Sequence, residues 1–261
     1  MQRRKIMRTV AIINQKGGCG KTTIAINLAA ALVELEKKVL LVDMDPQAHA
    51  SLGLDVTYHD VQHTTYDLIR NPRLRVGDCR FPLKPGFDII PSSPVLSAIE
   101  QELAGKPARE SRLGAKLSRL GDLYDYVIID SPPNVGLLTF NALMASSEVV
   151  IPVEPSYFSL QGLGRLRETL ELLENETKHK VAVHVLINNI EKRTTFSRDI
   201  VMELEKHHDA LLMESTISHS VKYKEAALRG VSIFEMDRAD RLQWEFLSLA
   251  REFEEKKKSL L

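Results

Sequence analysis

The chain has 261 residues, near the upper limit for one hydrophobic core, so we expect a single α/β domain over residues 1–261. Hydrophobic residues make up 44% of the chain, and no apolar run approaches the ~18 residues of a membrane span, which excludes an integral membrane protein. The formal net charge is +0, so any attraction to nucleic acid or anionic lipid must come from a local basic patch.

The amino terminus, MQRRKIMRTV, is basic but lacks the apolar block and small-residue cleavage site of a signal peptide. The only cysteines are Cys19 and Cys79, and Cys19 lies in a glycine-rich loop, so a structural disulfide is not expected. These features predict a cytoplasmic protein.

Short apolar runs rich in Val and Ile recur along the chain without polar alternation, which is typical of parallel strands buried on both faces. They lie at residues 9–13, 38–43, 126–130, 149–153 and 181–187, and a further strand is expected at 87–93. Helix-length segments separate them. This repetition predicts a three-layer domain, a mostly parallel twisted sheet with helices on both faces.

Two of the helical segments show a clear apolar face. Residues 22–38 place Ala25, Leu28, Leu32 and Leu35 at helical spacing. Residues 239–261 do the same with Leu242, Phe246, Leu249 and Phe253. The stretch 53–86 contains three prolines and little periodicity, so we expect loops and one short helix there.

The stretch NQKGGCGKTT, residues 14–23, follows the first expected strand and opens the first expected helix. The phosphate-loop pattern GxxxxGK[ST] fits at Gly20, Lys21 and Thr22. Its first glycine is replaced by Gln15, and a second lysine, Lys16, follows.

The context of this loop predicts a phosphate site, because backbone N–H groups and the positive end of a helix dipole converge there. Gly17, Gly18 and Gly20 let the backbone curl around phosphate oxygens. Lys21 is expected to reach the terminal phosphates, and the Thr22 hydroxyl is suited to bind Mg²⁺.

Carboxylates end two of the expected strands. LLVDMDPQ places Asp43 and Asp45 after one, and YDYVIIDSPP places Asp130 after another. Asp130 is suited to hold Mg²⁺ through a bound water, and Asp45 to accept a hydrogen bond from an attacking water. The alternative for each is a solvated Asp at a strand end.

The base of the nucleotide is less clearly specified. No NKxD guanine motif follows a later strand, which favours ATP over GTP. Asn188 and Asn189 end the run VLINN; their amides could contact the adenine edge or simply cap a turn.

Four motifs in this order, KGGCGKTT, LLVDMDPQA, YDYVIIDSPP and VEPSYFSLQGLGRL, resemble those of the ParA/MinD family of P-loop ATPases. The resemblance spans about residues 8 to 252 and is strongest to ParA-type partition ATPases. It implies the P-loop NTPase fold and a deviant Walker A loop in which Lys16 is the signature lysine.

The resemblance implies that Lys16 reaches across an ATP-bound homodimer to the phosphates of the other subunit, much as an arginine finger does. The resemblance also implies that Lys21 acts in cis, that Thr23 contacts the α-phosphate and that Asp45 orients water. Cys19 stands where relatives usually carry Val. The implied site residues are, for catalysis, Lys16, Lys21 and Asp45; for ATP, Lys16, Gly17, Gly18, Cys19, Gly20, Lys21, Thr22, Thr23 and Asn188; and for Mg²⁺, Thr22, Asp45 and Asp130.

The resemblance further implies an ATP dimer that binds nonspecific DNA on the nucleoid. A ParB-like or other cargo-associated partner would stimulate hydrolysis and so release the protein from DNA. Basic residues in the C-terminal half are candidates for the DNA face, although each taken singly could be an ordinary solvated charge. They are Arg193, Arg198, Lys222, Lys224, Arg229, Arg238 and Arg241.

The sequence does not specify the cargo, which could be a chromosome, a plasmid or a protein assembly. MEST and HSVKYKEA stand where partition relatives commonly carry IPRNVRLSEA, so the chain departs from the familiar chromosomal pattern. One alternative is a MinD-like or flagellar-number ATPase that binds membrane through a C-terminal helix, but Glu252, Glu254 and Glu255 oppose an anionic surface. Another, an iron-sulfur relative, would need cysteines placed to hold a cluster.

Overall fold

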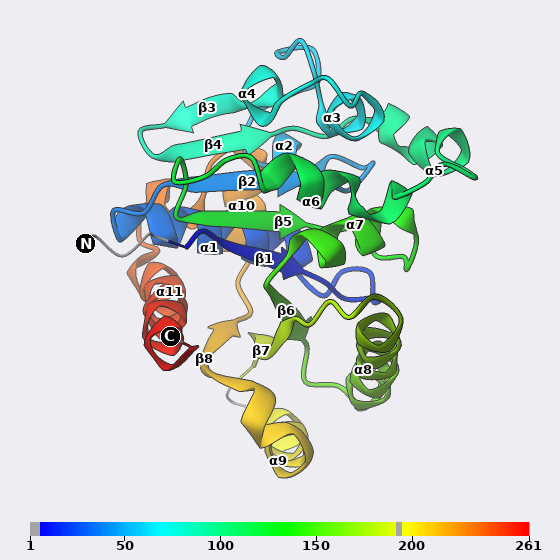
Figure 1. Ribbon diagram of the computed structural model, residues 1–261. Helices are drawn as coiled ribbons and strands as arrows, with labels where there is room; N and C mark the ends of the chain where they lie inside the picture. The colour runs from blue at the N-terminus through cyan, green and yellow to red at the C-terminus, as the bar shows by residue number, and fades with distance from the viewer. Residues whose placement is uncertain (1–5, 192–194, 261) are drawn as a thin grey trace.

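A twisted sheet forms the centre of the molecule, and its strands run in one direction with a single exception (Figure 1). The computed structural model describes residues 6–191 and 195–260. Within these residues the strands lie in the order β3 (Phe81–Lys84), β4 (Phe87–Ile90), β2 (Val39–Asp43), β5 (Tyr126–Asp130), β1 (Arg8–Ile12), β6 (Glu148–Val153), β7 (Ala182–Ile190) and β8 (Leu212–Ser218). The exception is β3, which is antiparallel to β4.

Helices cover both faces of the sheet, which confirms the predicted three-layer α/β fold. One face packs against α1 (Lys21–Glu34), α2 (His49–Leu52), α10 (Lys222–Leu228) and α11 (Asp240–Leu260). The other packs against α3 (Thr65–Arg70), α4 (Val76–Cys79), α5 (Ile99–Glu102), α6 (Arg112–Leu117), α7 (Leu137–Ala145), α8 (Tyr157–Thr177) and α9 (Thr195–His208).

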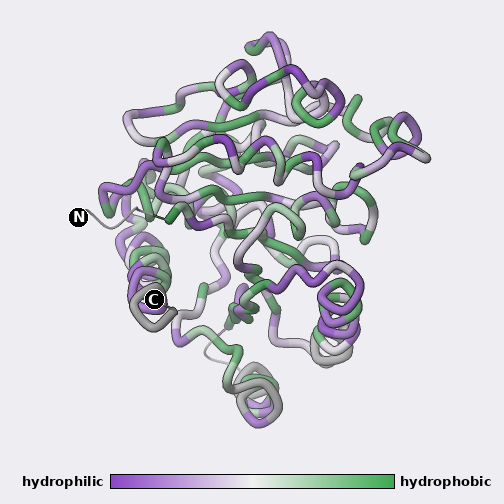
Figure 2. Tube along the Cα trace, in the orientation of Figure 1, coloured by the Kyte–Doolittle hydropathy of each residue, from purple (hydrophilic) through white to green (hydrophobic). Residues whose placement is uncertain are grey.

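The apolar runs are continuous because successive side chains of a strand enter different cores. In and just after β1, Val10 and Ile12 pack towards α1, whereas Ala11 and Ile13 pack towards the opposite helices. Neither face is left for a polar residue. Figure 2 shows the result as hydrophobic residues concentrated along the central strands.

The two strands at the edges of the sheet were not predicted. β3 lies in the stretch expected to hold loops and one short helix, which also contains α3 and α4. It carries Pro82, which an edge strand tolerates. β8 contains polar residues, and some of its backbone N–H groups donate to carboxylates of α11: Glu214 and Ser215 to Glu252, and Ser218 to Glu245. These bonds connect the edge strand to α11 and satisfy its backbone donors.

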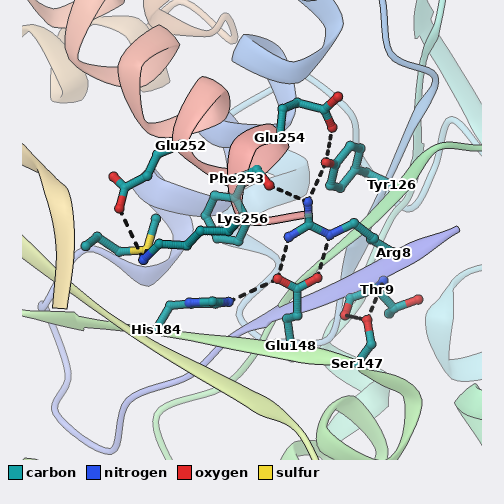
Figure 3. A network of polar contacts seen from close by, with 11 residues as sticks. Arg8, Thr9, Tyr126, Ser147, Glu148, His184, Glu252, Phe253, Glu254 and Lys256 are labelled. Carbon is teal, nitrogen blue, oxygen red and sulfur yellow. Dashed lines mark hydrogen bonds and ion pairs between the residues drawn. The ribbon is translucent and has the colours of Figure 1, made fainter. Parts of the chain in front are cut away.

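The C-terminal helix α11 buries the predicted apolar face against the sheet, with Leu242, Phe246, Leu249 and Phe253 all in the core. Figure 3 shows a polar network that fixes its end. Arg8 of β1 donates to the Phe253 carbonyl at 2.6 Å and to Glu148 at 2.6 Å. Among the described residues, no helix is long and apolar enough to traverse a bilayer.

Glu148 is the centre of this network. It lies at the start of β6 and accepts hydrogen bonds from Arg8 and from His184 of β7. Burial by itself raises the pKa of the Glu148 carboxyl, but the hydrogen bonds from His184 and Arg8 outweigh it and lower the pKa to about 2. The stability that this charge contributes is therefore present at neutral pH and is lost progressively as pH falls from the ordinary value of 4.5 to about 2.

Candidate functional site

The glycine loop connects β1 to α1 at the carboxyl end of the parallel strands, and α1 begins at Lys21, within the stretch expected to open the helix. Gly20 caps this helix with φ of 87°, a left-handed conformation that favours glycine. A Cβ at Gly20 would also lie 2.3 Å from the Asn188 side-chain nitrogen. Glycine is thus required here both by the backbone angle and by the close approach of β7.

Asn188 fastens the loop to β7. Its Nδ2 donates to the backbone carbonyl of Cys19 at 2.8 Å, so the amide supports the loop from a strand two positions away from β1 in the sheet. Cys19 itself is buried, and burial raises the pKa of its thiol. The contact of Asn188 with an adenine edge stays a prediction.

The two lysines of the loop occupy different environments. Lys21 is buried, and its Nζ lies 3.4 Å from the carbonyl of Lys16, inside the loop. The Lys16 side chain is 45% exposed and forms a 2.7 Å ion pair with Glu154. One cation therefore serves the interior of the loop, and the other lies at the surface.

Asp130 lies at the end of β5, fully buried beside the loop. The Thr22 hydroxyl, from the first turn of α1, donates to its Oδ2 at 2.7 Å. Its Oδ1 is buried and has no hydrogen-bond partner among the described residues. An unpartnered buried carboxylate oxygen beside a hydroxyl is the donor set expected for a hard cation.

Asp43 ends the adjacent strand β2 and is paired in register with Asp130. Its two oxygens accept from the Asp45 backbone and from the Ser51 hydroxyl and N–H, so Asp43 organises the turn that follows β2. Asp45 is 7% exposed, and its Oδ1 accepts from the Gln47 N–H at 2.9 Å. The structure therefore brings Asp45 and Asp130 to the same edge of the sheet as the glycine loop.

The charges at this edge repel one another. Burial, and then the nearby Asp43 carboxylate, raise the pKa of Asp130 well above its ordinary value. Burial likewise raises the pKa of Asp43 to about 6. A divalent cation on the free oxygen of Asp130 would offset both effects, so the residues present fit Mg²⁺ held by Thr22 and Asp130.

Asp130→Asn is expected to stabilise the metal-free protein while weakening its response to Mg²⁺. Because the pKa of Asp130 is raised in the folded chain, stability falls as pH rises from the ordinary value of 3.8 towards the raised pKa. At neutral pH we expect the melting temperature to rise by roughly 2–4 °C, which is about 1 kcal/mol for a chain of this size. The gain should shrink at acid pH, where the wild-type carboxyl is protonated.

Differential scanning fluorimetry from pH 4 to 8, with and without Mg²⁺ and ATP, tests this prediction. Asp122→Asn, at an exposed position before β5, is the matched control because it removes the same charge from the other end of the strands. A lower melting temperature at neutral pH would contradict the electrostatic assignment.

Sequence reasoning assigned no role to three residues that shape the site. Glu154 holds Lys16, Asn14 accepts from the Lys16 backbone N–H at 3.0 Å, and Ser51 binds Asp43. Glu154 and Asn14 directly follow apolar runs, and that position was the available signal. No sequence signal marked Ser51, because its helix α2 is one turn long and shows no periodicity.

The fold and this site together define a P-loop nucleotide-binding protein. A family model described as an AAA domain matches residues 7–183. The sporulation initiation inhibitor protein Soj of Bacillus subtilis is 37% identical over 246 residues, 94% of this chain and 97% of Soj. The chromosome partitioning protein ParA of Myxococcus xanthus is 35% identical over 247 residues, 94% of this chain and 87% of that protein. The chain belongs to the ParA family of P-loop ATPases.

Solved structures agree with this assignment. An McdA variant from Cyanothece in complex with ATP has a TM-score of 0.84 at 26% identity, and the match covers 95% of this chain and 96% of that one. Cobyrinic acid a,c-diamide synthase from Mycobacterium smegmatis with bound ADP and magnesium has a TM-score of 0.76 at 28% identity, covering 86% and 91%.

Proposed function

We propose that this chain is a Mg²⁺-dependent ATPase that dimerises in the ATP state, binds nonspecific DNA in that state, and partitions or positions a cargo. The ParA relatives support the proposal, and so do the structural neighbours bound to ATP or to ADP and magnesium. The observation that carries it is the environment of Lys16, a second loop cation whose side chain is 45% exposed and paired with Glu154, whereas Lys21 is buried.

The different environments of the two loop lysines support ATP-dependent dimerisation. Lys21, buried at the start of α1, is placed to bind phosphates in cis. Lys16, with its exposed side chain, is placed to reach the phosphates of a second copy. A cation supplied in trans offsets charge on the transferring phosphoryl group, so that hydrolysis depends on dimerisation.

The remaining loop and strand-end residues are assigned the roles that the family resemblance implies. The backbone of Gly17, Gly18, Cys19 and Gly20 cradles phosphates, Thr22 and Asp130 hold Mg²⁺, and Thr23 contacts the α-phosphate. Bound Mg²⁺ would neutralise part of the negative charge on the phosphates. Asp45, beside the metal residues, accepts a hydrogen bond from the attacking water.

The DNA face in this proposal extends from α10 through the connecting segment to the start of α11. Lys224, Arg229, Arg238 and Arg241 are exposed there, as phosphate contacts require. Lys222 is half-buried and donates to the Asp237 carbonyl at 3.0 Å. Arg193 lies outside the described residues, and so does the side chain of Arg198. The activating partner is a ParB-like or other cargo-bound protein, and the site of action is the nucleoid.

The alternative of a MinD-like or flagellar-number ATPase needs an apolar helix face that is free to bind lipid. In α11 that face packs in the core through Leu242, Phe246, Leu249 and Phe253. No observation therefore favours the membrane over DNA. Liposome sedimentation with ATP separates the two functions, and the DNA proposal expects no ATP-dependent pelleting.

Asp45→Ala is expected to trap the ATP dimer on DNA, because ATP still binds while the attacking water loses its acceptor. A loss of general-base assistance lowers turnover by about a hundredfold or more. Light scattering of the ATP-loaded variant should give the mass of a dimer, and gel shifts should show retention on DNA of unrelated sequence.

Asp122→Ala serves as the control, since Asp122 is exposed at the opposite end of the strands. Two results would refute the proposal: turnover of Asp45→Ala at the wild-type rate, or an ATP-loaded, hydrolysis-blocked protein that stays a monomer at high concentration.

A further inference from the structure

Glu154 is a carboxylate at the nucleotide edge of the sheet that the roles above leave unused. It directly follows β6, the neighbour of β1, and therefore faces the glycine loop across that edge. Its Oε2 accepts from Lys16 Nζ at 2.7 Å, and its Oε1 accepts from Asn189 Nδ2 at 2.9 Å. Both oxygens are engaged, and the Glu154 side chain is only 21% exposed.

The surrounding contacts hold the lysine in this position from both ends. The Lys16 backbone N–H donates to Asn14 Oδ1, and Asn14 Nδ2 donates to the Pro152 carbonyl of β6 at 2.7 Å. On the far side, Asn189 has φ of 57°, a left-handed conformation that asparagine adopts more readily than most residues. The Lys16 head is thus directed towards β6 of its own chain.

We propose that Glu154 is a latch that holds Lys16 in cis, and that ATP-dependent dimerisation draws Lys16 from Glu154 to the phosphates of a second copy. The inference rests on the proposed function, which supplies the trans role of Lys16. The carboxylate and the partner's nucleotide compete for one ammonium group. The latch therefore opposes dimerisation, and keeps hydrolysis low until a second ATP-loaded copy is present.

The size of the effect follows from the exposure of the pair. A partly exposed ion pair changes an equilibrium about twofold to fivefold. Two latches open in each symmetric dimer, so the effect on the dimer dissociation constant is squared, to about fourfold to twenty-fivefold. Screening by salt should reduce this effect on the dimer dissociation constant.

Glu154→Gln tests the latch because it removes the charge and keeps the size of the side chain. With Mg²⁺ and a non-hydrolysable ATP analogue, sedimentation velocity should give a dimer dissociation constant lower by about fourfold to twenty-fivefold at low salt, a difference that narrows at high salt. Glu176→Gln, an exposed charge near the distant end of α8, should leave it unchanged. Equal or weaker dimerisation of Glu154→Gln would overturn the latch.

A second measurement needs no dimer. In the nucleotide-free protein, an amine-acylating reagent should modify Lys16 faster in Glu154→Gln than in the wild-type chain, because the carboxylate no longer shields the ammonium. Peptide mass spectrometry quantifies the rate, and Glu176→Gln again serves as control. An unchanged rate overturns the latch alone. Faster acylation without dimerisation of either protein would overturn the proposed dimer, and with it the control of dimerisation by Glu154.

Discussion

Lys16→Ala is expected to bind Mg·ATP almost as tightly as the wild-type chain and yet to lose hydrolysis by about a thousandfold or more, the scale of a cation supplied in trans. Binding survives because the partly exposed Lys16 side chain is paired with Glu154, whereas the buried Lys21 remains to bind the phosphates. The stable ATP dimer should be lost with the activity. Single-turnover ATP hydrolysis, nucleotide titration and light scattering on the same sample measure the three properties.

The matched control for this variant is Lys180→Ala. Lys180 is an exposed lysine just before β7, at the end of the strands opposite the glycine loop, and its ion pair with Glu174 is long at 3.8 Å. It should hydrolyse and dimerise normally. If Lys16→Ala turned over ATP at the wild-type rate, the trans role of Lys16 would be wrong, and Glu154 would have no regulatory contact to break.

Lys21→Ala should give the opposite result. Its affinity for nucleotide should fall by on the order of a hundredfold or more, because bound phosphates would be left without their buried cation. Folding should survive. Lys21 Nζ makes one long hydrogen bond, to the Lys16 carbonyl at 3.4 Å, and alanine suits the first turn of α1.

Titration with a fluorescent ATP analogue measures the loss, and circular dichroism of the nucleotide-free variant checks the fold. Wild-type affinity in Lys21→Ala would remove its role in cis. Together the two lysine variants separate binding from hydrolysis, since one should bind without turning over and the other should not bind.

The central strands could be predicted from sequence because both of their faces are buried. Runs such as TVAII and YVIID are apolar without interruption, and the structure places them in β1 and β5 at the middle of the sheet. The edge strands β3 and β8 could not be predicted in this way. Pro82 interrupts β3, and β8 depends on carboxylates of α11, Glu245 and Glu252, that lie 27 to 38 residues later in the chain.

The sequence by itself determined the glycine loop, its two lysines and the aspartates at the strand ends, because each is a local pattern that specifies a turn, a helix start or a strand end. Only the tertiary structure decided which of these residues meet. Thr22 reaches Asp130 across 108 positions, Lys16 reaches Glu154 across 138, and Asn188 reaches Cys19 across 169. These contacts follow from the strand order β2, β5, β1, β6, β7, which the packing of the whole sheet fixes and no local segment encodes.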